Sequence, residues 1–308
     1  MFRLLKDRAI SLKLKSKLLL SFMLSSILIL LFFALIFYRY TANTLLEQSE
    51  NATLHTLSQI ESNLTTVLDT VNTISKNILT SSYFSEEMKL EQINSSEDVQ
   101  AINDIYNFFS EFLVNYNYIH SIVYYGDNGT VLGSSNAKNF FQPAADSDNF
   151  FYTSKLREDL NMQSSAILCG GFSYEDFFPG TYPETQNIRY ITLGRRLHTL
   201  HNVKGYVLIN IPESYIRSFY HNDSRVSSGE SMLLDADHTI ISCEDKALIG
   251  TTAGIQSLEN NHSIHLTLKY GDNQTLNDTN QIIYYSYHHY GLSIIYEVPY
   301  KILFANIQ

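Results

Sequence analysis

A run of 21 residues near the N-terminus, residues 18–38, contains no Asp, Glu, Lys or Arg. A helix rises about 1.5 Å per residue, so about 20 such residues cross the hydrocarbon core of a bilayer. The alternative is a cleaved signal peptide, but its apolar core is shorter, and Phe37 to Tyr40 make a poor cleavage site. We therefore predict an uncleaved transmembrane helix at residues 18–38.

Apolar residues continue beyond this run in alternating steps of three and four, with neither Pro nor Gly between Tyr38 and Tyr83. This 3.5-residue period predicts a long stalk helix over residues 39–82. The stripe either pairs with a second copy of the helix or lies along its own domain, and the sequence leaves both open. Its members are Leu57, Ile60, Leu64, Val67, Val71, Ile74 and Ile78.

A second helix is predicted from Ser95, which has the capping residue Asp98 three positions later. Beyond Tyr116 the pattern changes to the alternation and β-branched content of strands, with a turn of the sequence Gly-Asp-Asn-Gly at residues 126–129. Residues 139–160 are expected to be a loop with a short helix at 150–160, and Pro212 is expected to begin another helix. The predicted strands are 119–125, 130–133, 166–172, 188–198 and 205–211.

The hairpin pattern then recurs at residues 231–234 and 239–242, and further strands are predicted at 262–270, 281–287 and 292–298. Both stretches close with an apolar strand, a proline (Pro212 or Pro299) and the start of a helix. This duplication predicts an α+β fold in which one antiparallel-sheet module is used twice. We place the modules at residues 83–220 and 221–300, with an exit helix starting at 301–308.

Charge is distributed unevenly along the chain. Six basic residues and one acidic residue lie in residues 1–17, which favours a cytoplasmic N-terminus and residues 39–308 outside the cytoplasm. From Arg39 onward there are 15 basic and 30 acidic side chains, a formal charge of −15. Such a surface repels nucleic acid, so we expect no nucleic-acid partner.

In order and spacing, four segments resemble the double Cache sensor domain of bacterial transmembrane receptors, particularly YesM-type sensor histidine kinases. The segments are residues 12–22, 205–211, 232–237 with 249–250, and 297–300. The resemblance implies a membrane-distal PAS-like subdomain with the ligand pocket, a membrane-proximal one, and a second transmembrane helix leading to a cytoplasmic output. No phosphate-accepting histidine box or ATP-binding segment is recognisable. We therefore expect a fragment without enzyme activity, any kinase domain lying beyond Gln308.

The same resemblance places the ligand in the distal module. Phe151 and Tyr152 lie where the family often has a Trp-Tyr pair that brackets the ligand. Aromatic walls with a few convergent polar groups are typical of small-molecule sites, although many of the 22 tyrosines must also form core and surface. The other candidate ligand-binding residues are Tyr124, Tyr174, Asp176, Tyr190, Arg195 and Asn210.

Two departures from the family pattern bear on the ligand. Amino-acid-binding members carry Arg-x-Trp-Tyr where this chain has Asn149-Phe150-Phe151-Tyr152, and an Asp where it has Asn210. Arg would hold a carboxylate and Asp an ammonium group. Without either, we predict a neutral, sugar-like small molecule instead of a free amino acid.

No cofactor motif is present, and we expect no metal. The pairs His198/His201 and His262/His265 lie in or beside predicted strands, and the acidic clusters lack a calcium-loop continuation, so both are interpreted as turn or surface residues. These clusters are Asp235/Asp237 and Asp272/Asn273/Asn277/Asp278. Cys169 and Cys243 are expected to be free thiols, although a disulfide is an alternative.

These observations predict the extracytoplasmic sensor part of a membrane receptor, a histidine kinase first of all, that acts as a homodimer. One alternative places the same sensor on a membrane-bound transcription regulator or a chemoreceptor. Another, of a different class, is an anchored surface protein with a structural or adhesive role.

Overall fold

The computed structural model of the chain describes residues 14–85, 93–143, 150–178, 188–198, 203–221, 230–254, 269–270, 274–275, 280–287 and 289–299. The chain forms two compact units, Met1–Ala52 and Thr53–Gln308, each described here by itself. Several predictions lie outside the described residues. They concern residues 1–13, the strand portion 262–268, the exit helix at 301–308, and the side chains of His201, His262, His265, Asp272, Asn273, Asn277 and Asp278.

The predicted long helix is confirmed as α2 (Leu14–Thr80), which begins in the first unit and ends in the second. Its segment Leu14–Thr44 has a mean hydropathy of 2.8 and is long and apolar enough to cross a membrane. In the second unit the apolar stripe, from Leu57 to Ile78, is buried in the hydrophobic core of its own chain. The stripe therefore lies along its own domain, which decides between the two alternatives.

The first sheet has six antiparallel strands in the order β3-β2-β1-β6-β5-β4. The predicted strands are all found within a few residues of their expected bounds. The strands are β1 (Ser121–Gly126), β2 (Val131–Ser135), β3 (Asn139–Gln142), β4 (Ile167–Ser173), β5 (Arg189–His198) and β6 (Val203–Pro212).

Strand β3 was expected to be loop, so this part of the prediction is wrong. The residue opposite Phe140 on β2 is Gly133, and a Cβ atom there would lie 1.9 Å from the Phe140 ring. The missing side chain leaves space for that ring against the sheet, and the aromatic segment pairs as an edge strand.

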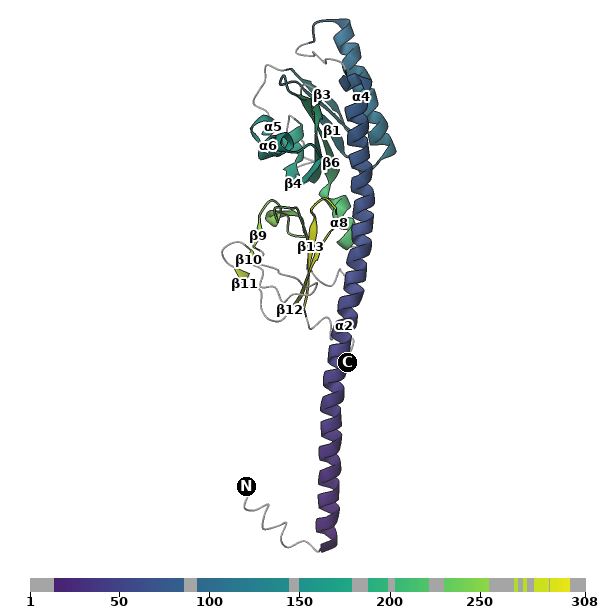
Figure 1. Cartoon of the computed structure of the whole chain (residues 1–308), viewed down its shortest axis with the longest axis vertical. Helices are drawn as coiled ribbons and strands as arrows, with labels where there is room; N and C mark the ends of the chain where they lie inside the picture. Colours follow the sequence, from purple (N-terminus) through teal and green to yellow (C-terminus); the bar gives the residue numbers. More distant parts are fainter. Residues whose placement is uncertain are drawn as a thin grey trace. The chain divides into compact units, whose positions relative to one another are not determined.

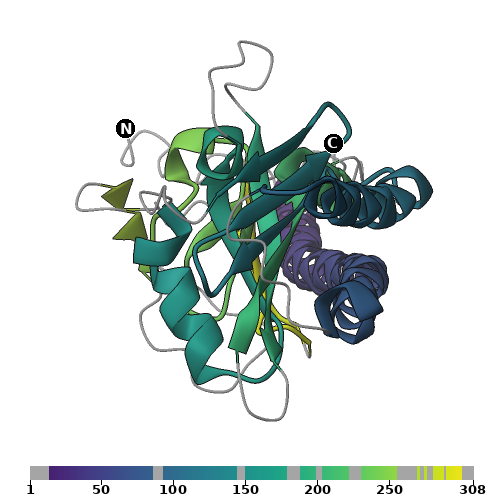
Figure 2. The same cartoon turned by 90° about the horizontal axis from the view of Figure 1, so that it is seen from above.

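Helices cover both faces of this sheet (Figures 1 and 2). The second-unit part of α2 and helix α4 (Ser96–Asn115), which begins with the predicted Ser95–Asp98 capping box, lie on one face. Helices α5 (Phe150–Thr153) and α6 (Lys155–Met162) lie on the other, so the helix expected at 150–160 is divided in two at Ser154. Two short helices, α3 (Ser82–Ser85) and α7 (Tyr174–Phe177), complete this module.

Helix α8 (Glu213–His221) starts directly after the last residue of β6, Pro212, and leads from the first module to the second module. Its main sheet has the order β12-β13-β7-β8, and a small sheet has the order β11-β10-β9. The structure is thus the predicted α+β fold with antiparallel sheets. Its strands are β7 (Glu230–Leu234), β8 (Ile240–Ser242), β9 (Ala253–Gly254), β10 (Lys269–Tyr270), β11 (Gln274–Thr275), β12 (Asn280–Ser286) and β13 (Ser293–Pro299), with the 3₁₀ helix η2 (Lys246–Leu248).

Candidate functional site

The two faces of the six-stranded sheet differ because side chains alternate along each strand. Tyr124, on β1, faces the helices: it belongs to the same hydrophobic cluster as α2, and its ring lies 5.0 Å from that of Phe84. Its neighbour Tyr125 faces the opposite way and belongs to a second cluster. We call this second side of the sheet the aromatic face.

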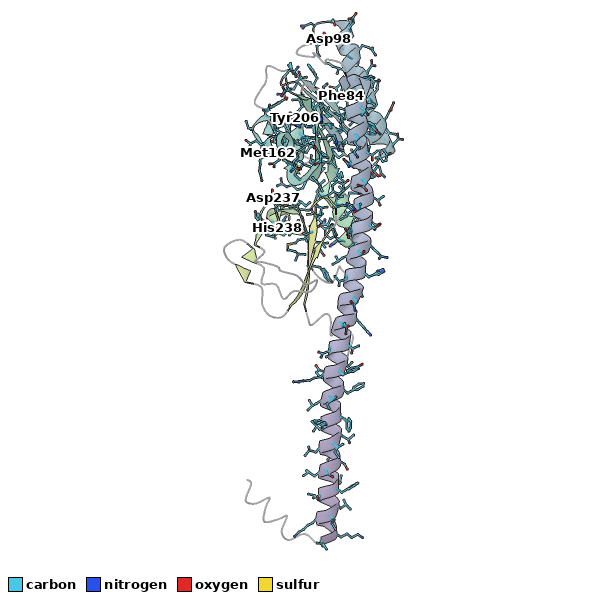
Figure 3. The ribbon with its side chains drawn as sticks, viewed as in Figure 1. Phe84, Asp98, Met162, Tyr206, Asp237 and His238 are labelled. Atoms are coloured by element: carbon cyan, nitrogen blue, oxygen red, sulfur yellow. The ribbon has the colours of Figure 1, made fainter. Side chains whose placement is uncertain are left out.

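The aromatic face is built from rings that come from the sheet and from α5 and α7. The Phe151 ring stacks on that of Tyr125 at a centroid distance of 4.2 Å and lies 5.1 Å from that of Tyr206, whose position is marked in Figure 3. Tyr174 stacks on Phe178 at 4.8 Å. The rings of this face are Tyr125, Phe150, Phe151, Tyr152, Tyr174, Phe177, Phe178, Tyr190 and Tyr206.

A chain of neutral polar groups crosses the centre of the same face. Asn210 on β6 accepts a hydrogen bond from Thr192 Oγ1 at 2.8 Å and donates one to Ser121 Oγ at 2.9 Å. The three residues are register partners on adjacent strands, which is why their side chains meet. All are fully buried, so this floor presents hydroxyl and amide groups without a formal charge.

His120 lies just before β1, next to Ser121, which is one end of this polar chain. Its backbone N–H donates to Asn210 O at 2.9 Å, and its ring lies 5.7 Å from the Tyr174 ring and 5.0 Å from the Tyr190 ring. Burial lowers the pKa of His120 and raises that of Tyr190. Both side chains are therefore uncharged at neutral pH.

Tyr152 and the charged groups beside it form one border of the face. The Tyr152 hydroxyl donates to Gly126 O at 2.7 Å, and the Arg157 guanidinium lies 5.3 Å from the centre of its ring. Arg157 also lies 3.7 Å from Asp127. Burial raises the pKa of Tyr152, and the Arg157 charge partly opposes that rise.

Of the eight residues expected to bind the ligand, five share the aromatic face: Phe151, Tyr152, Tyr174, Tyr190 and Asn210. Asp176 lies at the start of α7, where its carboxylate accepts from the Ser173 backbone at 2.6 Å as part of a capping box. Tyr124 and Arg195 lie on the helix face. Arg195 donates to Ser75 Oγ at 2.7 Å and to Asn72 Oδ1 at 2.6 Å, so it holds α2 against β5.

Sequence reasoning missed several residues of the aromatic face, among them His120, Tyr125 and Tyr206. The alternation on β1 contained the signal for Tyr125. Ile122 and Tyr124, two residues apart on β1, both face the apolar stripe of α2. Since side chains alternate along a strand, Tyr125 has to face the opposite side of the sheet.

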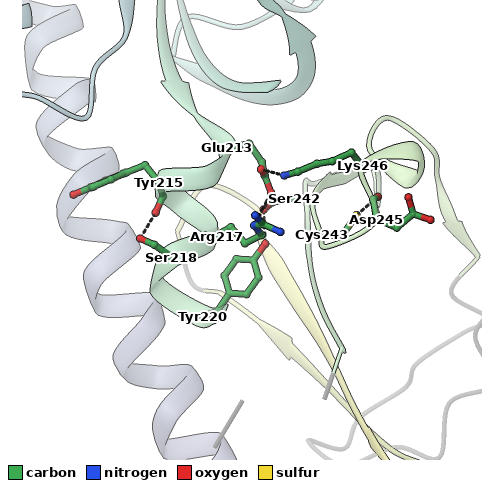
Figure 4. A network of polar contacts seen from close by, with 9 residues as sticks. All are labelled: Glu213, Tyr215, Arg217, Ser218, Tyr220, Ser242, Cys243, Asp245 and Lys246. Atoms are coloured by element: carbon green, nitrogen blue, oxygen red, sulfur yellow. Dashed lines mark hydrogen bonds and ion pairs between the residues drawn. The ribbon is translucent and has the colours of Figure 1, made fainter. Parts of the chain in front are cut away.

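Polar contacts join the two modules below this site (Figure 4). Glu213, at the start of α8, is 1% exposed, accepts from Ser242 Oγ on β8 at 2.5 Å and pairs with Lys246 of η2. The Tyr220 hydroxyl is hydrogen-bonded to the same Ser242 hydroxyl. Because Glu213 follows Asn210 by three residues, the polar chain of the aromatic face and this network are connected along one backbone.

Both modules also hold the same turns of α2. Arg195 of the first module contacts Asn72 and Ser75, and Tyr290 of the second donates to Asp69 Oδ1 at 2.6 Å. The two modules therefore contact one short segment of the helix.

Within the described ranges, no group of three or more His, Cys, Asp or Glu side chains is placed to hold a metal. Asp235 instead organises its turn by accepting from the backbone N–H groups of Asp237 and Thr239, at 3.0 and 2.8 Å. Cys169 and Cys243 are free thiols, and burial raises the pKa of Cys243 to about 11.

A long helix packed on two successive antiparallel sheets, the first with a buried aromatic face, defines a two-module sensor-type fold. The family described as Cache domain matches residues 37–307, and the chain belongs to this family. No curated protein sequence matches the chain.

Several solved sensory domains share the fold. The Pseudomonas fluorescens chemoreceptor CtaA, with L-isoleucine bound, is 12% identical with a TM-score of 0.59, covering 86% of this chain and 98% of the other. The Campylobacter jejuni chemoreceptor Tlp3 (CcmL) is 12% identical with a TM-score of 0.52 over the same shares. The extracellular domain of a protein described as a histidine kinase, vpHK1S-Z8, is 12% identical with a TM-score of 0.53, covering 84% and 98%.

Proposed function

We propose that this chain is the extracytoplasmic ligand-sensing part of a membrane receptor, anchored by the apolar segment of α2. Family membership and the likeness to sensory domains support this function. The observation that carries it is the aromatic face, where a buried chain of neutral hydrogen-bonding groups lies among aromatic rings. Such surroundings are typical of small-molecule sites.

We further propose that the ligand is neutral. The floor made by Ser121, Thr192 and Asn210 carries no charge to pair with an ammonium or a carboxylate group. The nearby ions are engaged elsewhere, since Asp176 caps α7 and Arg157 lies beside Asp127. The solved CtaA and Tlp3 domains hold branched aliphatic amino acids, and the uncharged Asn210 argues for a different ligand here.

For the output we propose a histidine kinase of the YesM type working as a homodimer, with a chemoreceptor as the second candidate. Solved domains of both receptor classes share this fold, which supports either output. In both, ligand binding would act by shifting the population of two states of the sensor.

A thermal-shift screen of the full chain in detergent tests the sensing function. The compounds are D-glucose, D-xylose, maltose, myo-inositol, L-isoleucine, succinate and spermidine. We expect a neutral compound to raise the Tm, and Tyr152→Ala to weaken its binding about tenfold through loss of ring contact. The matched control is Tyr83→Ala, a partly exposed ring on the helix face. If no compound raises the Tm, the result contradicts the sensing function and supports the alternative of an anchored surface protein with an adhesive role.

A further inference from the structure

Two buried polar atoms inside the aromatic face, Tyr125 Oη and His120 Nδ1, have no hydrogen-bond partner among the residues that the structure describes, and the same is true of Arg157 Nε at its border. The comparison with Tyr206 is direct, because this tyrosine is paired with Tyr125 across β1 and β6 and is buried on the same face. The Tyr206 hydroxyl donates to Asn161 Oδ1 at 2.7 Å. Buried polar groups are nearly always paired in folded proteins, so an orphaned pair on one face requires an explanation.

Ring contacts hold Tyr125 in place, and its buried hydroxyl is left without a hydrogen-bond partner in the described part of the chain. Its ring is fully buried, stacked on Phe151 and edge-on to Tyr152 at 6.0 Å. Burial, with smaller contributions from Tyr152 and Asp176, raises the pKa of Tyr125, so its hydroxyl stays protonated at neutral pH. It remains a neutral donor that can also accept.

His120, at the α7 end of the face, offers a second group. Its Nε2 lies 3.4 Å from the Tyr190 hydroxyl, and in either tautomer this leaves Nδ1 without a partner in the described part of the chain. Because the ring is neutral, one nitrogen donates and the other accepts. A bound molecule would complete that hydrogen bond without burying an unpaired charge.

Building on the proposed sensing function, we infer that Tyr125 Oη and His120 Nδ1 are the polar contacts of the ligand, and that the ligand is an uncharged sugar or polyol. A sugar ring has apolar C–H faces that stack on aromatic side chains such as Tyr152, which is only half-buried. Its hydroxyl groups both donate and accept, which suits a tyrosine hydroxyl and either tautomer of the histidine. Burying neutral hydroxyl groups against these two atoms satisfies both sides of each hydrogen bond.

The first experiment needs no ligand and compares the Tm of the full chain in detergent with those of Tyr125→Phe and Tyr206→Phe. Removing the orphaned hydroxyl of Tyr125 should leave the Tm unchanged within about 1 °C or raise it by about 2–4 °C. Removing the paired hydroxyl of Tyr206 should lower the Tm by about 2–4 °C. An equal fall in both variants would show that the Tyr125 hydroxyl is already satisfied and would overturn the inference.

The second experiment measures binding of D-glucose, D-xylose, maltose and myo-inositol to the same chain by calorimetry. Tyr125→Phe and His120→Asn should each weaken binding about five- to tenfold, and Tyr83→Phe on the helix face should leave it unchanged. If a sugar binds and both site variants keep the wild-type affinity, the inference fails while the sensing function stands. The same holds if only L-isoleucine, succinate or spermidine binds. If none of the seven compounds binds, both fail together.

Discussion

Replacing Glu213 by Ala is expected to weaken the contact between the two sheet modules. The carboxylate is almost fully buried between α8 and β8, where it accepts from Ser242 and pairs with Lys246 (Figure 4). Arg217, one turn further along α8, places its Nε 3.9 Å from the same carboxylate. One side chain thus joins the helix that leaves the first module to two segments of the second.

The expected loss can be worked out from these contacts. A hydrogen bond to a charged acceptor contributes about 1.5–3 kcal/mol, which sets the Ser242 contribution. The Lys246 and Arg217 side chains are 39% and 25% exposed, so water can solvate them in the variant, and each ion pair adds only about 0–1 kcal/mol. The variant should therefore lose about 1.5–5 kcal/mol of unfolding free energy.

Urea unfolding of the full chain in detergent, followed by tyrosine fluorescence and circular dichroism, measures this loss; the chain has 22 Tyr and no Trp. The comparison variant is Asp237→Ala, which removes a second contact between the modules. Both partners of its Lys155–Asp237 ion pair are 74% exposed, so it should cost less than about 0.5 kcal/mol. Equal effects of the two variants would refute the assignment of the interface energy to Glu213.

Three further predictions concern individual side chains. Arg195→Met should speed hydrogen exchange of α2 around Asn72, because the guanidinium that fastens this turn is lost; unchanged exchange there would contradict its role. Burial holds the pKa of His120 in the folded chain below its value in the unfolded chain, about 6.5. The unfolded chain therefore binds the proton more readily, and the Tm should fall as the pH is lowered from about 7 to about 5. That fall should be smaller in His120→Asn, and equal pH profiles would argue against it. Gly170→Val should lower the free energy of unfolding in urea by about 1–3 kcal/mol, because a Cβ atom at this position would lie 2.6 Å from Ile241 of the second module. In the control variant Gly250→Ala the new Cβ meets no atom within 4 Å, so the loss should come only from backbone strain at its positive φ.

Much of the architecture was predictable from residue patterns. The 3.5-residue period placed the apolar stripe of α2, and the Ser95–Asp98 spacing placed the start of α4, because both depend on neighbours in sequence. Strand β3 was missed because its pairing depends on the empty space at Gly133, seven residues from Phe140 in sequence and opposite it in the sheet.

Five of the predicted site residues share a face: Tyr190 and Asn210 lie on strands of the sheet, and the rings of Phe151, Tyr152 and Tyr174 pack on that face from α5 and α7. Tyr124 was predicted to lie with them because it is a tyrosine. The alternation of side chains along β1 instead places it on the side of the sheet that the helices cover. Arg195 illustrates the remaining limit, since its partners Asn72 and Ser75 lie more than 100 residues away and no local pattern connects them.

The burial of the α2 stripe changes how two chains can associate. Its apolar side chains, from Leu57 to Ile78, are occupied by the domain's own sheets, so they are not available for a leucine-zipper contact between receptors. The exposed side carries Thr66, Thr73 and Thr80 at seven-residue spacing, and each hydroxyl donates to a carbonyl four residues earlier in its own helix. Two such helices placed side by side would meet through threonine methyl groups and exposed polar side chains such as Ser62, Lys76 and Asn77, a weaker contact than an apolar zipper.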